Sequence, residues 1–111
     1  MIDIYYLDDE PALCFIFKES FNTNEINITT FTSAVEAVAA CQEKPPKAIF
    51  VDMRLQDTTG DKVAEELADD IKKYLVTGDM INASDFAFQE VLTKPFDMEH
   101  IKSLLDDLND E

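Results

Sequence analysis

Five short segments of this chain have the composition of β-strands, and they alternate with segments whose apolar residues recur at helical spacing. The strand segments are rich in β-branched and aromatic residues. When strands and helices alternate in this way, each helix returns the chain to the same end of the sheet, so the strands run parallel. We therefore predict an α/β fold, a doubly wound five-stranded parallel sheet with helices on both faces. The strands are predicted at residues 2–7, 26–31, 48–51, 74–76 and 91–93.

The helices are predicted from apolar spacing and from residues that favour helix ends. Pro11 suits the first turn of a helix, and Ser33 with Glu36 forms a capping box. Pro45 and Pro46 end the second helix near residue 43. The apolar residues that mark the helices are Leu13, Ile16, Phe17 and Phe21; Val35, Val38 and Ala39; Val63, Ala64 and Leu67; and Ile101, Leu104, Leu105 and Leu108.

The composition indicates one domain with an acidic surface. The chain has 111 residues, 46% of them hydrophobic, which is enough for one core. Its net charge of -15 repels phosphate backbones and anionic lipids, so we expect no nucleic acid and no membrane among its partners. The same charge favours divalent cations and basic protein surfaces.

Cysteine usage and the first residues of the chain predict a cytoplasmic protein. Cys14 and Cys41 lack the spacing of metal ligands and lie among apolar residues, so we expect free, partly buried thiols in a reducing compartment. The sequence carries no signal-peptide pattern, and no apolar run approaches the roughly 20 residues of a membrane span.

Polar residues stand where four of the predicted strands end. Asp8 and Asp9 follow the first strand, Asp52 the third, Thr77 the fourth and Lys94 the fifth. Ligands of parallel sheets bind at this carboxyl edge. Three neighbouring carboxylates repel one another unless a cation lies between them, and Mg²⁺ prefers such oxygen ligands. The pattern therefore predicts a Mg²⁺ site.

The same edge has the groups needed to receive a phosphoryl group. Lys94 can neutralise a phosphate oxygen and Thr77 can donate a hydrogen bond to another. Asp52 can be the nucleophile, because carboxylates form aspartyl phosphates. Each residue alone also has an ordinary reading as a helix cap, a turn residue or a surface lysine. The prediction depends on all five occurring together, in this order.

Four motifs give the sequence a resemblance to the response-regulator receiver family across nearly its whole length. They are Leu7-Asp8-Asp9-Glu10-Pro11, Ile49-Phe50-Val51-Asp52-Met53-Arg54-Leu55, Leu75-Val76-Thr77-Gly78 and Leu92-Thr93-Lys94-Pro95-Phe96. The resemblance implies a flavodoxin-like sheet with strand order 2-1-3-4-5. It also implies a single receiver domain at residues 1–111, which we expect to stand alone without an effector domain.

The resemblance assigns roles to the residues at the strand ends. It implies that Asp52 is the phosphoacceptor and that Asp9 is a direct Mg²⁺ ligand. Asp8 would act mainly through metal-bound water, and Arg54 would offer its backbone carbonyl to the metal.

The remaining roles concern the fourth and fifth strands. Thr77 is implied to be the switch hydroxyl and Lys94 the phosphate-binding lysine. Gly78 matches a small residue that leaves access to the phosphoryl group, and a cis peptide is expected between Lys94 and Pro95.

The chain departs from the family in the segment that follows Thr77. The position of the usual switch aromatic holds Val91, for which Phe86 or Phe88 would be a substitute. The distance along the chain from Thr77 to Lys94 is short, so the helix between the fourth and fifth strands is predicted to be short or missing.

Smaller departures lie in the loops at the strand ends. Gln56 stands where proline is usual. Arg54 and Asp79 occupy positions that tune the lifetime of the phosphoryl group in the family.

The sequence predicts a signalling domain rather than an enzyme. A histidine kinase or histidine phosphotransfer protein would donate the phosphoryl group, and the output would be altered protein–protein binding. A phosphorylation-independent docking module is the alternative. A phosphatase of the haloacid-dehalogenase type needs a second acid two positions after the nucleophile, where this chain has Arg54. His100 lies away from the strand ends and is expected to be a solvated helix residue.

Overall fold

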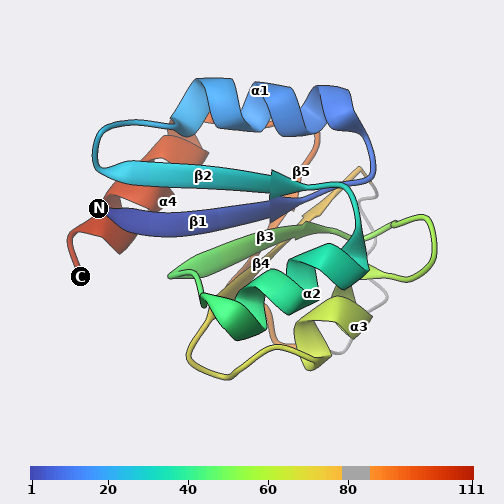
Figure 1. The fold of residues 1–111 in the computed structure, drawn as a ribbon. Helices are drawn as coiled ribbons and strands as arrows, with labels where there is room; N and C mark the ends of the chain where they lie inside the picture. Colours follow the sequence, from blue (N-terminus) through green and yellow to red (C-terminus); the bar gives the residue numbers. More distant parts are fainter. Residues whose placement is uncertain (79–85) are drawn as a thin grey trace.

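The structure, a computed structural model, describes residues 1–78 and 86–111. Within these residues, five strands form one sheet in the order β2-β1-β3-β4-β5, and every neighbouring pair is parallel (Figure 1). This confirms the predicted doubly wound sheet and its strand order. The strands are β1 (Ile2–Leu7), β2 (Ile26–Phe31), β3 (Ala48–Asp52), β4 (Lys72–Thr77) and β5 (Glu90–Thr93).

The described residues also form four helices, and α3 is the shortest of them. Ser33 accepts a hydrogen bond from the backbone N–H of Glu36 at 3.3 Å, as the predicted capping box requires. Asp97 caps the last helix in the same way, through the N–H of His100. The helices are α1 (Pro11–Phe21), α2 (Ala34–Glu43), α3 (Gly60–Glu65) and α4 (Met98–Asn109).

Helices cover both faces of the sheet, as predicted (Figure 1). The core on the α1 and α4 side is largely aromatic: Phe17 of α1 packs against Tyr6 and Phe50, and Phe50 stacks on Tyr74 at 4.7 Å between ring centroids. The core on the α2 and α3 side is mainly aliphatic and contains Val51. Because β1, β3 and β4 are covered on both faces, their central residues are almost all buried.

The buried faces of α1 and α2 differ from the apolar pattern expected from the sequence. In α1 the buried residues are Cys14, Phe17 and Phe21, while Ile16 is 41% exposed. In α2 Val35 is 80% exposed. Apolar residues cover more than half of α1, and only packing against the sheet decides which of them are buried. Both thiols are free, as expected, and both are buried, more deeply than the partial burial expected.

The predicted shortening of the helix between β4 and β5 concerns residues that lie mostly outside the described part of the chain. Residues 79–85, which include Asp79, are not described. The described residues 86–89 that follow carry no helix before β5 begins. The helix labelled α4 is therefore the C-terminal one.

None of the helices in the described residues is long and apolar enough to cross a membrane.

Candidate functional site

The carboxyl ends of β1, β3, β4 and β5 meet at one edge of the sheet, as the parallel topology requires. The site residues predicted from the sequence come together there around a cavity of about 370 Å³. Of the predicted site residues, Asp8 is the one that does not line the cavity, because its side chain is fully buried. The lining residues are Asp9, Glu10, Asp52, Arg54, Thr77, Gly78 and Lys94.

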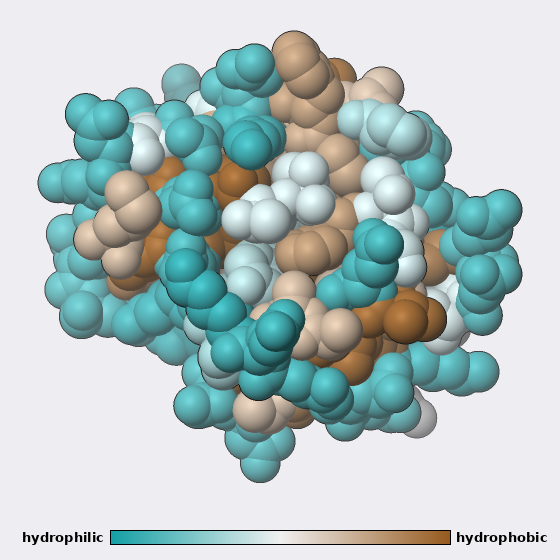
Figure 2. All heavy atoms as spheres, in the orientation of Figure 1, coloured by the Kyte–Doolittle hydropathy of each residue, from teal (hydrophilic) through white to brown (hydrophobic). Residues whose placement is uncertain are grey.

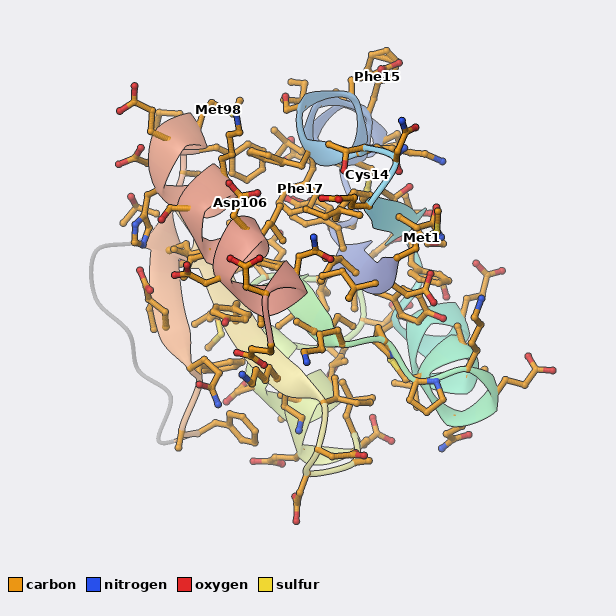
Figure 3. The ribbon with its side chains drawn as sticks, turned by 90° about the vertical axis from the view of Figure 1, so that its left-hand side faces the viewer. Met1, Cys14, Phe15, Phe17, Met98 and Asp106 are labelled. Atoms are coloured by element: carbon orange, nitrogen blue, oxygen red, sulfur yellow. The ribbon has the colours of Figure 1, made fainter. Side chains whose placement is uncertain are left out.

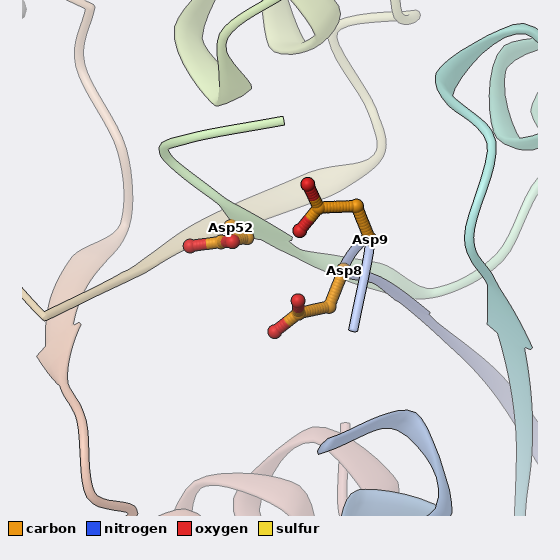
Figure 4. Close-up of side chains that lie close together, drawn as sticks. All are labelled: Asp8, Asp9 and Asp52. Carbon is orange, nitrogen blue, oxygen red and sulfur yellow. The ribbon is translucent and has the colours of Figure 1, made fainter. Parts of the chain in front are cut away.

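The three carboxylates converge as the sequence predicts. Asp8, Asp9 and Asp52 each place one oxygen within 4.8 Å of the others (Figure 4). Asp8 and Asp52 are buried, whereas Asp9 is half-buried. Oxygen donors at this separation fit Mg²⁺, which binds proteins through a few carboxylates and completes its shell with water and phosphate oxygens. The residues present therefore fit the metal that the sequence predicts.

Lys94 reaches into the acidic cluster. Its Nζ lies 2.9 Å from Asp8 Oδ2 and 3.3 Å from Asp52 Oδ1. Burial lowers the pKa of the Lys94 ammonium, but the hydrogen bond and charge of Asp8, together with the charge of Asp52, raise it by more. Lys94 is therefore a fixed positive charge beside the Asp52 carboxylate.

The environment of Asp52 opposes its negative charge. Burial and the nearby charge of Asp8 raise the pKa of Asp52 above its usual range, against the smaller opposing effect of Lys94. An added cation would offset the free-energy cost of desolvating the Asp52 charge and would weaken its repulsion by Asp8. This electrostatic environment is a second reason to expect a cation here, independent of the geometry.

The loop after β3 holds Asp52 in place through its backbone. The Met53 N–H donates to Val76 O at 3.1 Å, and the Gly60 N–H donates to Met53 O at 2.9 Å. Arg54 and Thr59 form an antiparallel bridge that closes the loop. Arg54 thus lines the cavity.

Gly60, the first residue of α3, lies directly against the backbone of Asp52. A Cβ at this position would lie 2.5 Å from the backbone oxygen of Asp52 and 3.1 Å from the Leu75 side chain. No real Cβ packs that closely against a backbone atom, so only glycine lets α3 begin beneath the acceptor. The motif around Asp52 gives no sign of this contact.

The ends of β4 and β5 are joined directly. The Lys94 N–H donates to Thr77 O at 2.9 Å, and Thr77 is buried beside the cavity. The Lys94–Pro95 peptide is cis, as the resemblance implies. The hydroxyl and the ammonium predicted to bind a phosphoryl group therefore lie on neighbouring strand ends.

Neither Phe86 nor Phe88, the predicted substitutes for the switch aromatic, lines the cavity at this edge. Gln89 bonds to Lys73 O, near the amino end of β4. Thr77 lies four positions after Lys73, about 13 Å farther along the strand. Phe86 and Phe88 pack on each other at 4.7 Å before β5 begins, whereas Val91, in β5, is 40% exposed.

Comparison with protein families identifies the family to which the chain belongs. The model of the response regulator receiver domain matches residues 4–106. The chain belongs to the response regulator receiver domain family. Domains of this family are phosphoacceptor signalling domains rather than enzymes in the usual sense.

Solved structures agree with the fold of this receiver domain. Response regulator protein TrrA from Thermotoga maritima, crystallised in complex with Mg²⁺-BeF, is 25% identical with a TM-score of 0.87, and the match covers 97% of this chain and 99% of that one. A CheY-like receiver domain from Methylobacillus flagellatus is 22% identical with a TM-score of 0.84, and the match covers 97% and 98%.

A longer curated relative matches the same region. The acid tolerance regulatory protein ActR of Rhizobium meliloti (strain 1021) is 26% identical over 107 residues. That match covers 89% of this receiver domain and 55% of ActR. The chain therefore spans about half the length of this relative.

Proposed function

We propose that this receiver domain accepts a phosphoryl group on Asp52 from a histidine kinase or a histidine phosphotransfer protein, in a Mg²⁺-dependent reaction. The observation that carries the proposal is the position of Asp52. Its carboxylate opens on the cavity, next to Asp9 and within 3.3 Å of the Lys94 ammonium.

In the proposed reaction an Asp52 carboxylate oxygen attacks the phosphorus of a phosphohistidine. The new O–P bond forms as the N–P bond breaks, and the imidazole nitrogen keeps the electron pair. Lys94 neutralises charge on the transferred oxygens, and the Thr77 hydroxyl donates to one of them. The chemistry needs little more than positioning and charge, and the strand ends supply both.

Asp8, Asp9, Asp52 and the backbone carbonyl of Arg54 are the groups that would hold Mg²⁺. The bound metal would neutralise charge on the acceptor and on the incoming phosphoryl group. The TrrA structure with Mg²⁺-BeF supports this part of the proposal, since its receiver has the same fold and 25% identity.

The output is proposed to be altered binding of another protein. Phosphorylation replaces the Asp52 carboxylate with a group of greater negative charge and more acceptor oxygens, for which Thr77 and Lys94 are available. The net charge of -15 favours a basic partner surface over nucleic acid or membrane. A stand-alone role and a cytoplasmic location remain parts of this proposal.

A phosphorylation assay tests the proposal. The protein is incubated with a small phosphodonor such as acetyl phosphate, with Mg²⁺ or with EDTA, and its intact mass is measured. Wild type with Mg²⁺ should gain one phosphoryl group, and neither the EDTA sample nor Asp52→Asn should gain it.

Two outcomes would contradict the proposal. An unmodified wild type would favour a docking module that works without phosphorylation. Sustained release of phosphate from many phosphoesters would instead indicate a phosphatase.

A further inference from the structure

Tyr6 is a buried polar residue to which the proposed reaction gives no role. It lies in β1, two residues before Asp8, and its side chain is fully buried. Its hydroxyl donates to Asp8 Oδ2 at 2.8 Å. Since strand residues two apart share a face, Tyr6 points toward the same side of the sheet as Asp8.

The tyrosine ring has little freedom to move. It stacks on Phe17 of α1 with 4.3 Å between ring centroids and 13° between planes. Phe96, which follows the cis peptide after Lys94, packs edge-on against the same ring at 6.0 Å. Because the ring is held by these contacts, the Tyr6 hydroxyl approaches Asp8 from a fixed position and direction.

The Asp8 carboxylate accepts three hydrogen bonds from the described residues. Tyr6 and Lys94 both donate to Oδ2, and the Glu10 N–H donates to Oδ1 at 3.0 Å. A carboxylate has about four acceptor positions, so these bonds leave about one. Such a carboxylate suits a supporting role through metal-bound water better than direct, multidentate binding.

Within the described residues, Lys94 is shared between Asp8 and Asp52, whereas the Tyr6 hydroxyl donates to Asp8. A phosphoryl group on Asp52 would draw the Lys94 ammonium toward its oxygens. The fully buried Asp8 carboxylate then keeps its orientation through its remaining donors, the Glu10 N–H on Oδ1 and the Tyr6 hydroxyl on Oδ2. Tyr6 supplies a bond that does not depend on where Lys94 points.

We infer that Tyr6 is a positioning residue of this site, whose hydroxyl holds the Asp8 carboxylate in the orientation that supports Mg²⁺ binding. The inference rests on the proposed function, because it concerns the same metal. Groups that orient metal-binding side chains typically contribute about tenfold or more to metal affinity. Tyr6 is neither a ligand nor a catalytic residue.

Tyr5 provides a matched control on the same strand. Its hydroxyl also donates a hydrogen bond, to Lys44 O at 2.7 Å, and its ring belongs to the core on the opposite face of the sheet. Tyr6→Phe and Tyr5→Phe thus each remove one bonded hydroxyl and keep the ring. Only the first should change the metal site.

The experiment measures Mg²⁺ binding by calorimetry on unphosphorylated protein without a phosphodonor, after circular dichroism has verified folding. Tyr6→Phe should bind Mg²⁺ about tenfold more weakly than wild type, and Tyr5→Phe should match wild type. In a phosphorylation series, the Mg²⁺ concentration for half-maximal rate should rise for Tyr6→Phe by the same factor. The rate at saturating Mg²⁺ should be unchanged, which a merely destabilised protein would not show.

A second pair of variants tests whether the effect runs through Asp8. Adding Tyr6→Phe to Asp8→Asn should leave the Mg²⁺ affinity of Asp8→Asn unchanged. The Asp8→Asn background also offers a folded protein in which to study Tyr6→Phe if the single variant does not fold. In that background the buried charge of Asp8 is gone, so losing the Tyr6 hydroxyl leaves no buried charge short of a partner. If Tyr6→Phe weakened Mg²⁺ binding by the same factor in the Asp8→Asn background as in wild type, the inference would be overturned.

The outcomes separate the inference from the proposed function. Equal Mg²⁺ affinity for wild type and Tyr6→Phe, an equal loss in Tyr5→Phe, or no Mg²⁺ binding by wild type would overturn the role of Tyr6. A wild type that binds Mg²⁺ and loses affinity with Tyr6→Phe, yet is never phosphorylated, would support the role of Tyr6 and contradict the proposed function.

Discussion

Asp52 illustrates how a single residue can be costly for folding and useful for chemistry. The residue is 7% exposed and its carboxylate lies beside Asp8, so the folded protein stabilises the charge of Asp52 poorly. The same burial and crowding leave the site in need of a cation. We expect the cost to be measurable as stability and to be relieved by metal.

Replacing Asp52 with asparagine should raise the melting temperature at neutral pH in metal-free buffer. Because the pKa of Asp52 is raised in the folded state, the folded protein holds its proton more tightly than the unfolded chain. The free energy of unfolding therefore falls as pH rises from the usual range of aspartate through the raised pKa. The loss is complete once the pH exceeds that raised pKa, and Asp52→Asn removes it.

Thermal denaturation followed by circular dichroism checks this prediction. The difference in melting temperature between Asp52→Asn and wild type should vanish in acid, where Asp52 is protonated in both the folded and the unfolded protein. The same difference should become smaller when Mg²⁺ binds and stabilises wild type. A less stable Asp52→Asn at neutral pH would show that the charge of Asp52 is well solvated or fully paired.

The close contact at Gly60 leads to a prediction about stability, for which Gly78 serves as the comparison. Gly60→Ala should lower the free energy of unfolding by about 1–3 kcal/mol, as overpacking does, because the new Cβ meets the Asp52 backbone oxygen at 2.5 Å. At Gly78 a Cβ would meet no atom of the described residues within 4 Å, so Gly78→Ala should change stability by less than about 0.5 kcal/mol. Urea denaturation of both variants measures the difference, and equal values would contradict the close approach.

At the scale of elements, α1 links the aromatic core to the site. Figure 3 shows Phe17 between α1 and the sheet and Phe15 on the outer side of the helix. Phe17 is fully buried and contacts the rings of Phe21, Phe50 and Phe96 as well as Tyr6. Phe15 is 63% exposed. Because both positions hold phenylalanine on the same helix, comparing substitutions at them isolates the effect of burial.

Phe17→Ala should lower the free energy of unfolding by about 3–5 kcal/mol, because it leaves a cavity among the rings. Phe15→Ala on the same helix should change it by less than about 0.5 kcal/mol. Urea denaturation distinguishes the two. Similar losses from both would mean that α1 does not pack on the sheet through Phe17.

At the scale of the whole molecule, the excess of negative charge is the main electrostatic feature. Figure 2 shows hydrophilic residues over most of one face of the protein. Some charges are paired: Glu111 binds Lys47 and Lys72 and so connects the C-terminus to the amino end of the sheet. With 24 acidic residues against 9 basic ones, most acidic groups repel one another.

Added salt should therefore stabilise the protein. Raising KCl from about 0.05 M to about 0.5 M shortens the screening length severalfold and weakens the repulsion more than it weakens the few surface ion pairs. The melting temperature should rise in metal-free buffer for both wild type and Asp52→Asn. A fall in both would mean that the surface ion pairs outweigh the repulsion.

The sequence predicted the fold because strand composition and helical spacing alternate clearly along the chain. It predicted the arrangement of Asp8, Asp9, Asp52, Thr77 and Lys94 because parallel strands bring their carboxyl ends together. Those inferences need only the order of elements, and they hold here.

Tyr6 and Gly60 were not predicted, because their roles depend on distances between elements. The two-residue spacing of Tyr6 and Asp8 places them on one face, but only the packed ring brings the hydroxyl to 2.8 Å. The contact of Gly60 with Asp52 likewise depends on how α3 meets β3. The buried faces of α1 and α2 were missed for a related reason, since apolar residues outnumber the buried positions.

The most direct test of the account is to trap the acceptor residue chemically. The protein is incubated with acetyl phosphate and Mg²⁺ and then treated with borohydride, which reduces an aspartyl phosphate to homoserine. Peptide mass spectrometry then locates the modified residue. Conversion at Asp52 alone, and only when Mg²⁺ is present, is the result that the account predicts. Conversion at another acid, or none in wild type, would contradict it.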